Sequence, residues 1–141
     1  MLFRSYLPSQ IFKFIISLRI FLYEKKILTS NKYSVKIISI GNLIMGGAGK
    51  TPTVEYVADY LVKNNKDFAI ISRGYKRKTR GMIIVSDSDS YLTVGDEPMQ
   101  YFKKFGKQSK IIVSEDRKIA LDYCQKNSIS FVILEIGRAH V

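Results

Sequence analysis

The sequence predicts an α/β domain with a mainly parallel sheet and flanking helices, preceded by an amphipathic N-terminal helix. Three observations lead to this prediction. Short apolar, β-branched runs alternate with segments of helical spacing, a pattern typical of consecutive βαβ units. The apolar runs lack polar alternation, as expected for strands buried on both faces. A glycine-rich segment lies directly between the first apolar run and the helical segment that follows it.

The composition is that of one globular domain and favours an anionic partner. The chain has 141 residues, of which 46% are hydrophobic and 25% charged, and its formal net charge is +11. This length suffices for one hydrophobic core. The basic excess predicts nucleic acid, a phosphorylated substrate or an anionic membrane surface as partner. The one cysteine, Cys124, excludes an internal disulfide and is expected in the core of a protein from a reducing cytoplasm.

Residues 1–34 form a separate N-terminal segment. Large apolar side chains fill Ile11 to Leu28, but Lys13 and Arg19 interrupt them, so neither a transmembrane helix nor a cleaved signal peptide is expected. Helical spacing instead gathers four apolar side chains on one face: Ile11, Ile15, Leu18 and Leu22. The many basic residues favour a helix lying in a membrane interface, and a helix packed on its own domain is the alternative.

The domain itself is expected from residue 35 to residue 134. Strands are expected at Val35–Ile40, Phe68–Ser72, Met82–Val85, Lys110–Ser114 and Ile129–Leu134. Helices are expected from Pro52 to the Asn64-Asn65 pair, from Glu97 to Phe105 and from Asp116 to Lys126. Pro52 suits a first helical turn, where its missing N–H is not needed. On the last helix, Ile119, Ala120 and Tyr123 are expected to lie on one face.

The segment Gly46-Gly47-Ala48-Gly49-Lys50-Thr51 has the features of a phosphate-binding loop. Glycines let successive backbone N–H groups point at a phosphate, and the following helix adds its positive end. We expect Lys50 to reach the β- and γ-phosphate oxygens and the Thr51 hydroxyl to ligate Mg²⁺. The common pattern has a glycine where Ile44 stands, and an ordinary glycine turn is the alternative. The predicted fold is therefore P-loop NTPase-like, with ATP and Mg²⁺ as cofactors. The predicted nucleotide-binding residues are Ile44, Met45, Gly46, Gly47, Ala48, Gly49, Lys50 and Thr51.

Two further polar segments are candidates for binding. Five basic residues and no acidic residue lie in the segment from Arg73 to Arg80. Four interpretations are open: the loop binds a nucleic-acid backbone, binds a substrate phosphate, contacts anionic lipid, or is exposed to solvent without a binding role. Arg73 directly follows a predicted strand, the place where ligands bind in α/β sheets, and is favoured for that reason. Gly95-Asp96-Glu97-Pro98 is a turn that opens a helix. Asp96 is either the N-cap of that helix or a group that engages Mg²⁺ or a hydroxyl.

Four motifs occur in a characteristic order: Ile38-Ser39-Ile40-Gly41-Asn42-Leu43, Gly46-Gly47-Ala48-Gly49-Lys50-Thr51-Pro52-Thr53, Ser72-Arg73-Gly74-Tyr75 and Val94-Gly95-Asp96-Glu97-Pro98. Together they resemble tetraacyldisaccharide 4'-kinase, the lipid A 4'-kinase of Gram-negative bacteria, from about Leu7 to Leu134. The resemblance implies transfer of the ATP γ-phosphoryl to the 4'-hydroxyl of a lipid disaccharide 1-phosphate. It implies a peripheral or monotopic enzyme at the cytoplasmic face of the inner membrane, with no nucleic acid as partner. It also implies a catalytic role for Lys50, a metal-binding role for Thr51, and substrate binding by Arg73, Tyr75 and Asp96.

After Leu134 the chain departs from that family, whose members continue with an Asp-Asp-Gly-Phe-Gln-His-like segment and a second domain. The catalytic acid or base is therefore expected beyond Leu134, and the domain here is expected to be incomplete. The heptapeptide Glu135 to Val141 is one that the codons GAG ATC GGA AGA GCA CAC GTC would encode. From its second base this string is a common sequencing adapter, followed by a stop codon. We interpret residues 135–141 as non-native and expect neither Glu135 nor His140 to be catalytic.

Two other classes of function fit the residues. One is a P-loop ATPase or GTPase that drives the assembly of a partner, and the other is a non-catalytic basic module that binds membranes or nucleic acid.

Overall fold

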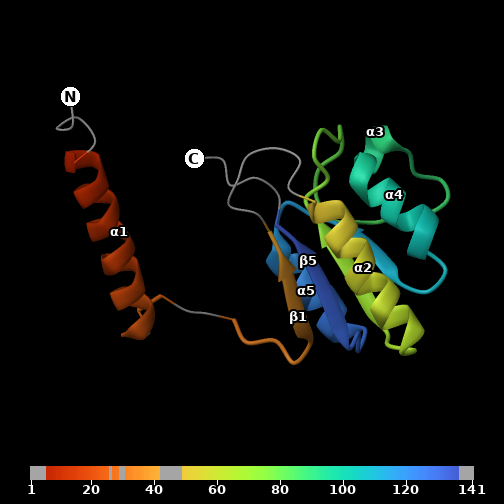
Figure 1. The fold of residues 1–141 in the computed structure, drawn as a ribbon, viewed down its shortest axis with the longest axis horizontal. Helices are drawn as coiled ribbons and strands as arrows, with labels where there is room; N and C mark the ends of the chain where they lie inside the picture. Colours follow the sequence, from red (N-terminus) through yellow and green to blue (C-terminus); the bar gives the residue numbers. More distant parts are fainter. Residues whose placement is uncertain (1–5, 26, 29–30, 42–48, 137–141) are drawn as a thin grey trace. The chain divides into compact units, whose positions relative to one another are not determined.

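A computed structural model describes residues 6–25, 27–28, 31–41 and 49–136. The chain divides into two compact units, residues 1–32 and 33–141 (Figure 1). The division falls two residues before the boundary drawn from the sequence. Unit 1 contains the helix α1, Tyr6–Glu24. This helix begins five residues before Ile11, the first residue of the apolar segment, and ends four residues before Leu28, its last residue. The expected helix is therefore present, with both ends shifted towards the N-terminus.

Unit 2 is built on a five-stranded sheet with the strand order β1-β5-β2-β4-β3. The strands are β1 (Lys36–Ile40), β2 (Phe68–Ser72), β3 (Ile83–Ile84), β4 (Lys110–Val113) and β5 (Phe131–Glu135). The helices are α2 (Lys50–Lys63), α3 (Tyr91–Val94), α4 (Asp96–Phe105) and α5 (Arg117–Lys126). All neighbouring strands are parallel except β3, which runs antiparallel to β4. The mainly parallel α/β fold is thus confirmed, while β3 is shorter than expected and α3 was not anticipated.

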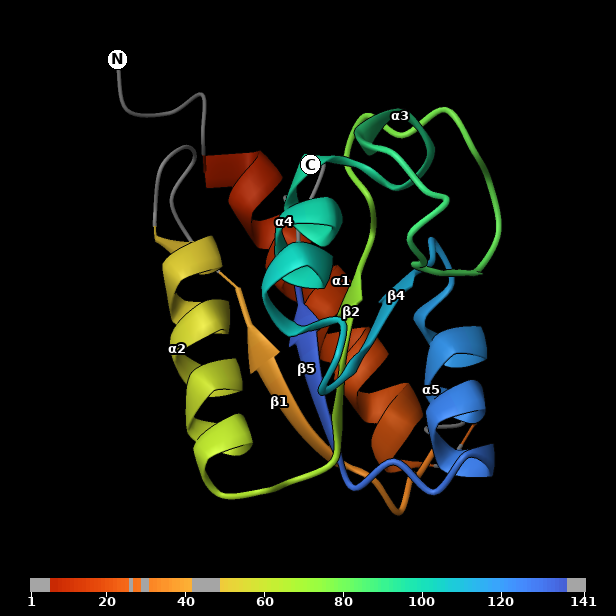
Figure 2. The ribbon, with the colours of Figure 1, turned by 90° about the vertical axis from the view of Figure 1, so that its right-hand side faces the viewer.

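The sheet separates two hydrophobic clusters, which explains why its strands are apolar throughout. Helices α2 and α4 cover one face, and α5 covers the other (Figure 2). Successive residues of β2 alternate between them: Ile70 belongs to the cluster under α2 and α4, and Ile71 to the cluster under α5. Both side chains are at most 1% exposed. Strands β2, β4 and β5 each contribute residues to both clusters, as is typical of parallel strands, whereas the edge strands β1 and β3 contribute to one cluster only.

Helix α5 differs from the expectation in the face it buries. Asp116 stands outside the helix as its N-cap, where its side chain accepts a hydrogen bond of 2.8 Å from the backbone N–H of Lys118. The buried residues of α5 are Ala120, Leu121 and Cys124. Ile119 is 51% exposed, so the face shared by Ile119, Ala120 and Tyr123 is not the buried one, whereas the buried position expected for Cys124 is confirmed. The buried stripe is rotated by one position relative to the expected one, about 100° around the helix.

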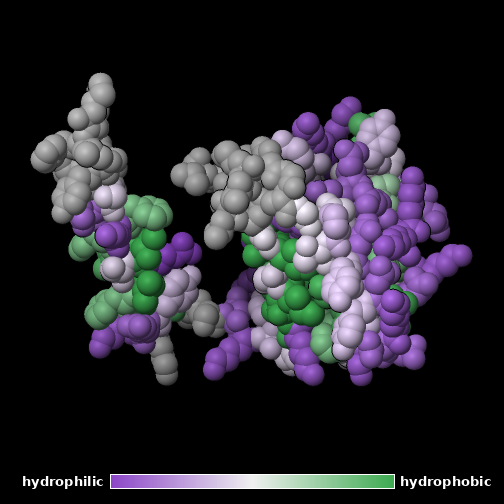
Figure 3. All heavy atoms as spheres, in the orientation of Figure 1, coloured by the Kyte–Doolittle hydropathy of each residue, from purple (hydrophilic) through white to green (hydrophobic). Residues whose placement is uncertain are grey.

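Helix α1 carries large apolar side chains around much of its surface, and unit 1 alone does not bury them. Phe12 and Phe14 are 63% and 68% exposed. Figure 3 shows apolar side chains along this helix and, separately, over the edge strand β1 of unit 2. None of the described helices combines the length and apolar character that crossing a bilayer requires.

Candidate nucleotide-binding site

The parallel strands bring the candidate site residues to one edge of unit 2. Strands β1, β5, β2 and β4 run in the same direction, so their carboxyl ends meet at a single edge of the sheet. Helix α2 follows the loop after β1, so its N-terminus lies at the same edge (Figure 1). Ligands of open α/β sheets bind at this edge.

Helix α2 begins where the expected phosphate-binding loop ends. Gly49 is its N-cap and has a φ of 68°, a left-handed conformation that glycine adopts without strain. The Gly49 carbonyl accepts hydrogen bonds from the backbone N–H (3.1 Å) and hydroxyl (2.8 Å) of Thr53. Lys50 and Thr51 are the first two helical residues, at the positive end of the helix dipole. The other expected loop residues, Ile44, Met45, Gly46, Gly47 and Ala48, lie outside the described residues.

Helix α4 places a carboxylate beside Thr51. The Thr51 hydroxyl donates a hydrogen bond of 3.3 Å to Oε1 of Glu97. Gly95, rather than Asp96, is the N-cap of α4, so the N-cap interpretation of Asp96 was wrong. Asp96 is the first helical residue and is exposed. Its neighbour Glu97 points to α2 because adjacent helical side chains diverge by about 100°.

A second carboxylate, that of Glu135, lies at the carboxyl end of β5. Glu135 pairs with Ile40 of β1 and is 2% exposed, and its two carboxylate oxygens have no hydrogen-bond partner among the described residues. The pKa of Glu135 is raised to about 7, mainly by burial and also by the negative charge of Glu97, while the positive charge of Lys50 acts in the opposite direction. Hydroxyl and carboxylate oxygens are the ligands that Mg²⁺ prefers, so the Thr51–Glu97 pair fits a magnesium nucleotide.

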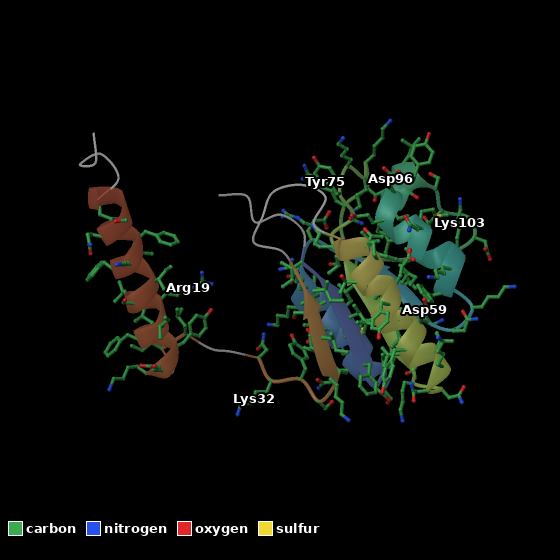
Figure 4. All side chains as sticks on the ribbon, in the orientation of Figure 1. Arg19, Lys32, Asp59, Tyr75, Asp96 and Lys103 are labelled. Carbon is green, nitrogen blue, oxygen red and sulfur yellow. The ribbon has the colours of Figure 1, made fainter. Side chains whose placement is uncertain are left out.

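The Ser72-Arg73-Gly74-Tyr75 segment packs against the start of α4. A Cβ on Gly95 would stand 3.0 Å from the carbonyl oxygen of Tyr75, and one on Gly74 would stand 2.7 Å from the carbonyl oxygen of Val94. The two glycines therefore allow a close backbone contact between segments some twenty residues apart. This contact brings Tyr75 and Asp96 to the same end of unit 2 (Figure 4). Arg73, Tyr75 and Asp96 are all exposed there.

The basic loop between Arg73 and Arg80 contains one residue with a structural role. The side chain of Arg77 is 3% exposed and forms an ion pair of 2.5 Å with Glu115. Arg77 also donates a hydrogen bond to the carbonyl oxygen of Gly81, and the Gly81 N–H donates to Glu115. The other four basic residues of the loop, Arg73, Lys76, Lys78 and Arg80, are not buried. Arg77 thus fixes the loop, and the remaining basic residues are the ones available to an anion.

Sequence reasoning missed two residues of the site, Glu97 and Tyr101. They are four positions apart and so share a face of α4. Tyr101 is fully buried, and Pro98 and Phe105 continue the same buried stripe. The stripe was visible in the sequence, but only the packing of α4 on α2 shows that its first turn meets Thr51.

Comparisons with known proteins agree with this geometry. A family model described as LpxK, tetraacyldisaccharide-1-P 4'-kinase, matches residues 5–140. A tetraacyldisaccharide 4'-kinase of Aquifex aeolicus is 42% identical over 146 aligned positions that cover 99% of this chain and 45% of the relative. One from Porphyromonas gingivalis is 36% identical over 129 positions that cover 89% of this chain and 36% of the relative.

A solved structure of a tetraacyldisaccharide 4'-kinase also resembles this chain. The crystal structure of LpxK from Aquifex aeolicus in complex with ATP superposes with a TM-score of 0.70 at 41% identity, covering 95% of this chain and 44% of that one. The chain therefore spans less than half the length of these relatives. With the phosphate loop, the Ser72–Tyr75 segment and the start of α4 in the family's order, and with nearly the whole chain matched, the chain belongs to the tetraacyldisaccharide 4'-kinase family.

Proposed function

We propose that this chain is the N-terminal portion of an ATP-dependent kinase that phosphorylates the 4'-hydroxyl of tetraacyldisaccharide 1-phosphate. The observation that carries the proposal is the meeting of Thr51, at the start of α2, with Glu97, at the start of α4. This hydrogen bond connects the phosphate-binding motif, which ends at Thr51, with the Gly95-Asp96-Glu97-Pro98 motif, which contains the proposed substrate-binding residue Asp96. The proposed activity belongs to the complete kinase, a protein of the relatives' length that contains this segment.

In the proposed reaction, this chain holds the phosphates. Lys50 binds the β- and γ-phosphate oxygens and stabilises the charge that develops during transfer, while the N–H groups at the start of α2 bind phosphate oxygens. Thr51 and Glu97 would hold Mg²⁺ through their oxygens. When bound, this ion neutralises phosphate charge and orients the transferred group. Phosphoryl transfer depends mainly on position and charge, so these residues supply much of what the donor needs.

Arg73, Tyr75 and Asp96 are proposed to bind the acceptor. They lie at the carboxyl end of β2 and the start of α4, next to the proposed phosphate site. An open groove of about 510 Å³ begins at Asp96 and runs along α4, and its lining residues are Tyr91, Asp96, Met99, Gln100, Lys103 and Lys104. Arg73 suits a phosphate or sugar oxygen, Tyr75 an apolar or sugar face, and Asp96 a hydroxyl.

Helix α1 is proposed to lie in the cytoplasmic surface of the inner membrane as a peripheral or monotopic element. Its exposed apolar side chains and its basic residues, such as Lys13 and Arg19, match an anionic lipid interface. Vesicles that contain phosphatidylglycerol test this in the complete kinase. Replacing Phe12 and Phe14 by serine should weaken co-sedimentation, whereas unchanged co-sedimentation would contradict the membrane role.

We also propose that residues 135–141 are a translated sequencing adapter and that the native chain continues differently after Leu134. A buried glutamate whose carboxylate has no partner among the described residues is consistent with a non-native side chain at position 135. The family match extends to residue 140, so similarity alone does not decide the matter. The coding DNA decides it, because synonymous codons that differ from the adapter would disprove the idea.

The function is tested by following γ-phosphoryl transfer with radiolabelled ATP in the complete kinase. Lys50→Ala should abolish transfer and ATP binding together, because the phosphates lose their main cation. Lys63→Ala, in the last turn of the same helix, is the matched control and should leave both unchanged. If Lys50→Ala retained full transfer, the proposed site would be wrong.

A further inference from the structure

The hydroxyl of Tyr101 is a buried polar group without a protein partner among the described residues. Tyr101 is 0% exposed and packs in the core between α4, α2 and the sheet. Its oxygen accepts and donates no hydrogen bond within that part of the chain. Leaving a buried hydroxyl unpaired destabilises the folded state, and phenylalanine would fill the same space without that cost. We therefore expect the Tyr101 hydroxyl to form a hydrogen bond with a group that is not among the described residues of unit 2.

The groups around this hydroxyl belong to the proposed nucleotide site. Burial raises the pKa of Tyr101 well above its usual range, and the negative charges of Glu135, Glu97 and Glu55 add to that effect. The nearby Thr51 hydroxyl acts in the opposite direction and lowers the pKa of Tyr101. Thr51 in turn donates to Glu97. Thr51 lies at the start of α2 and Glu97 in the first turn of α4, so the groups that act on the Tyr101 hydroxyl include both partners of the Thr51–Glu97 hydrogen bond.

The chemistry of this cluster matches a hydrated cation. The ionised carboxylate of Glu97 can only accept hydrogen bonds, and a tyrosine hydroxyl offers one donor and two acceptor lone pairs. Bound Mg²⁺ keeps several of its water molecules, which donate to carboxylates and to hydroxyl oxygens alike. Such waters would satisfy both the Tyr101 hydroxyl and the carboxylate oxygens that face it.

We propose that Tyr101 is a positioning residue of the magnesium-nucleotide site, whose hydroxyl hydrogen-bonds the oxygen atoms around the metal and so keeps Thr51 and Glu97 in place. This inference rests on the proposed function. Thr51, Glu97 and Tyr101 all precede residue 135, so the inference does not depend on the identity of the residue at position 135. Tyr101 acts through Thr51 and Glu97 and does not touch the transferred group.

The test is Tyr101→Phe in the complete kinase, measured by thermal unfolding without nucleotide and by calorimetric titration of ADP with and without Mg²⁺. The unliganded variant should be as stable as the wild type or more stable, because an unpaired buried hydroxyl is gone. Its affinity for magnesium ADP should fall by about threefold to tenfold, the equivalent of one ordinary hydrogen bond. Its affinity for ADP in the presence of EDTA should not change.

Tyr33→Phe is the matched control. The Tyr33 hydroxyl is also buried, but Tyr33 precedes β1 and lies at the opposite end of the sheet. This variant should bind magnesium ADP as the wild type does. A Tyr101→Phe protein that is less stable without nucleotide, yet keeps its magnesium ADP affinity, would overturn the inference. The proposed function fails separately, if the wild type itself neither binds magnesium ADP nor phosphorylates the lipid.

Discussion

The hydroxyl of Thr51 donates a hydrogen bond to the carboxylate of Glu97 across 3.3 Å. The two residues are 46 positions apart in the sequence and open two different helices, α2 and α4. A side-chain pair of this kind orients the threonine oxygen that the proposed site offers to Mg²⁺. The function proposed for this chain therefore depends on how α4 packs on α2 as much as on the phosphate loop.

Glu97→Gln should weaken binding of magnesium ATP by the complete kinase by about tenfold to a hundredfold. The amide keeps the shape of the side chain but loses the charge that holds the Thr51 hydroxyl and favours the cation. Titration of ATP binding against Mg²⁺ concentration measures this effect. Glu55→Gln is the control, since Glu55 faces Gln100 and Lys104 and lies outside the Thr51 contact. Equal effects of the two substitutions would contradict a specific role for Glu97.

Gly74→Ala should disturb the site more than Gly81→Ala. Both glycines have a left-handed φ, 72° and 80°, so both substitutions carry a backbone strain of about 1–2 kcal/mol. Only at Gly74 would the new Cβ meet other atoms, among them the Val94 carbonyl oxygen at 2.7 Å; at Gly81 nothing lies within 4 Å. Thermal unfolding and the KM for the lipid acceptor measure the difference. Equal destabilisation would show that the close contact with the start of α4 is unimportant.

Arg77→Ala should lower the free energy of unfolding by about 2 kcal/mol, because it removes a buried guanidinium and leaves Glu115 without its ion-pair partner. Denaturant unfolding measures this change. Arg80→Ala, in the same loop but exposed, should change stability by no more than about 0.5 kcal/mol. If Arg80→Ala proved the more destabilising, the structural role given to Arg77 would be wrong.

The Arg77–Glu115 pair also predicts a dependence of stability on pH. Burial alone would raise the pKa of Glu115, but hydrogen bonds from its own backbone and from Arg77, with the Arg77 charge, hold it below its ordinary value of 4.5. A carboxylate whose pKa is lowered in the folded state stabilises the protein at pH values above the pKa of the same group in the unfolded state. This stabilisation is lost as the pH falls through the pKa of the folded state. The stability difference between wild type and Glu115→Gln should therefore shrink as the pH falls below about 4.5. A difference that stayed constant would contradict this account.

Much of the fold was predictable from local patterns. Strand β2 and the ends of α2 agree with the sequence expectation because a continuous β-branched run, Pro52 and Asn64 act over a few residues. On α5, the spacing grouped Ile119, Ala120 and Tyr123, but the packing against the sheet buries Ala120, Leu121 and Cys124 on the adjacent stripe. The four-residue helix α3 gives too short a pattern to be recognised.

The candidate site was predictable only in part, because some of its residues acquire their roles through contacts between distant segments. Lys50 and Thr51 follow a motif whose spacing implies its chemistry. Glu97, Tyr101 and Arg77 acquire their roles through contacts between distant segments. In the sequence, Arg77 is indistinguishable from the four basic neighbours that remain accessible. The roles of such residues become visible only when the packing of α4 and of the loop after β2 is known.

The most direct test of the central claim is to incubate the complete kinase with ATP, Mg²⁺ and tetraacyldisaccharide 1-phosphate and to measure nucleotide and lipid together. The account predicts that each ATP consumed yields one lipid with a second phosphate at the 4' position, and that little ATP is consumed without the lipid. Hydrolysis of ATP that leaves the lipid unchanged and requires an added protein partner would contradict it.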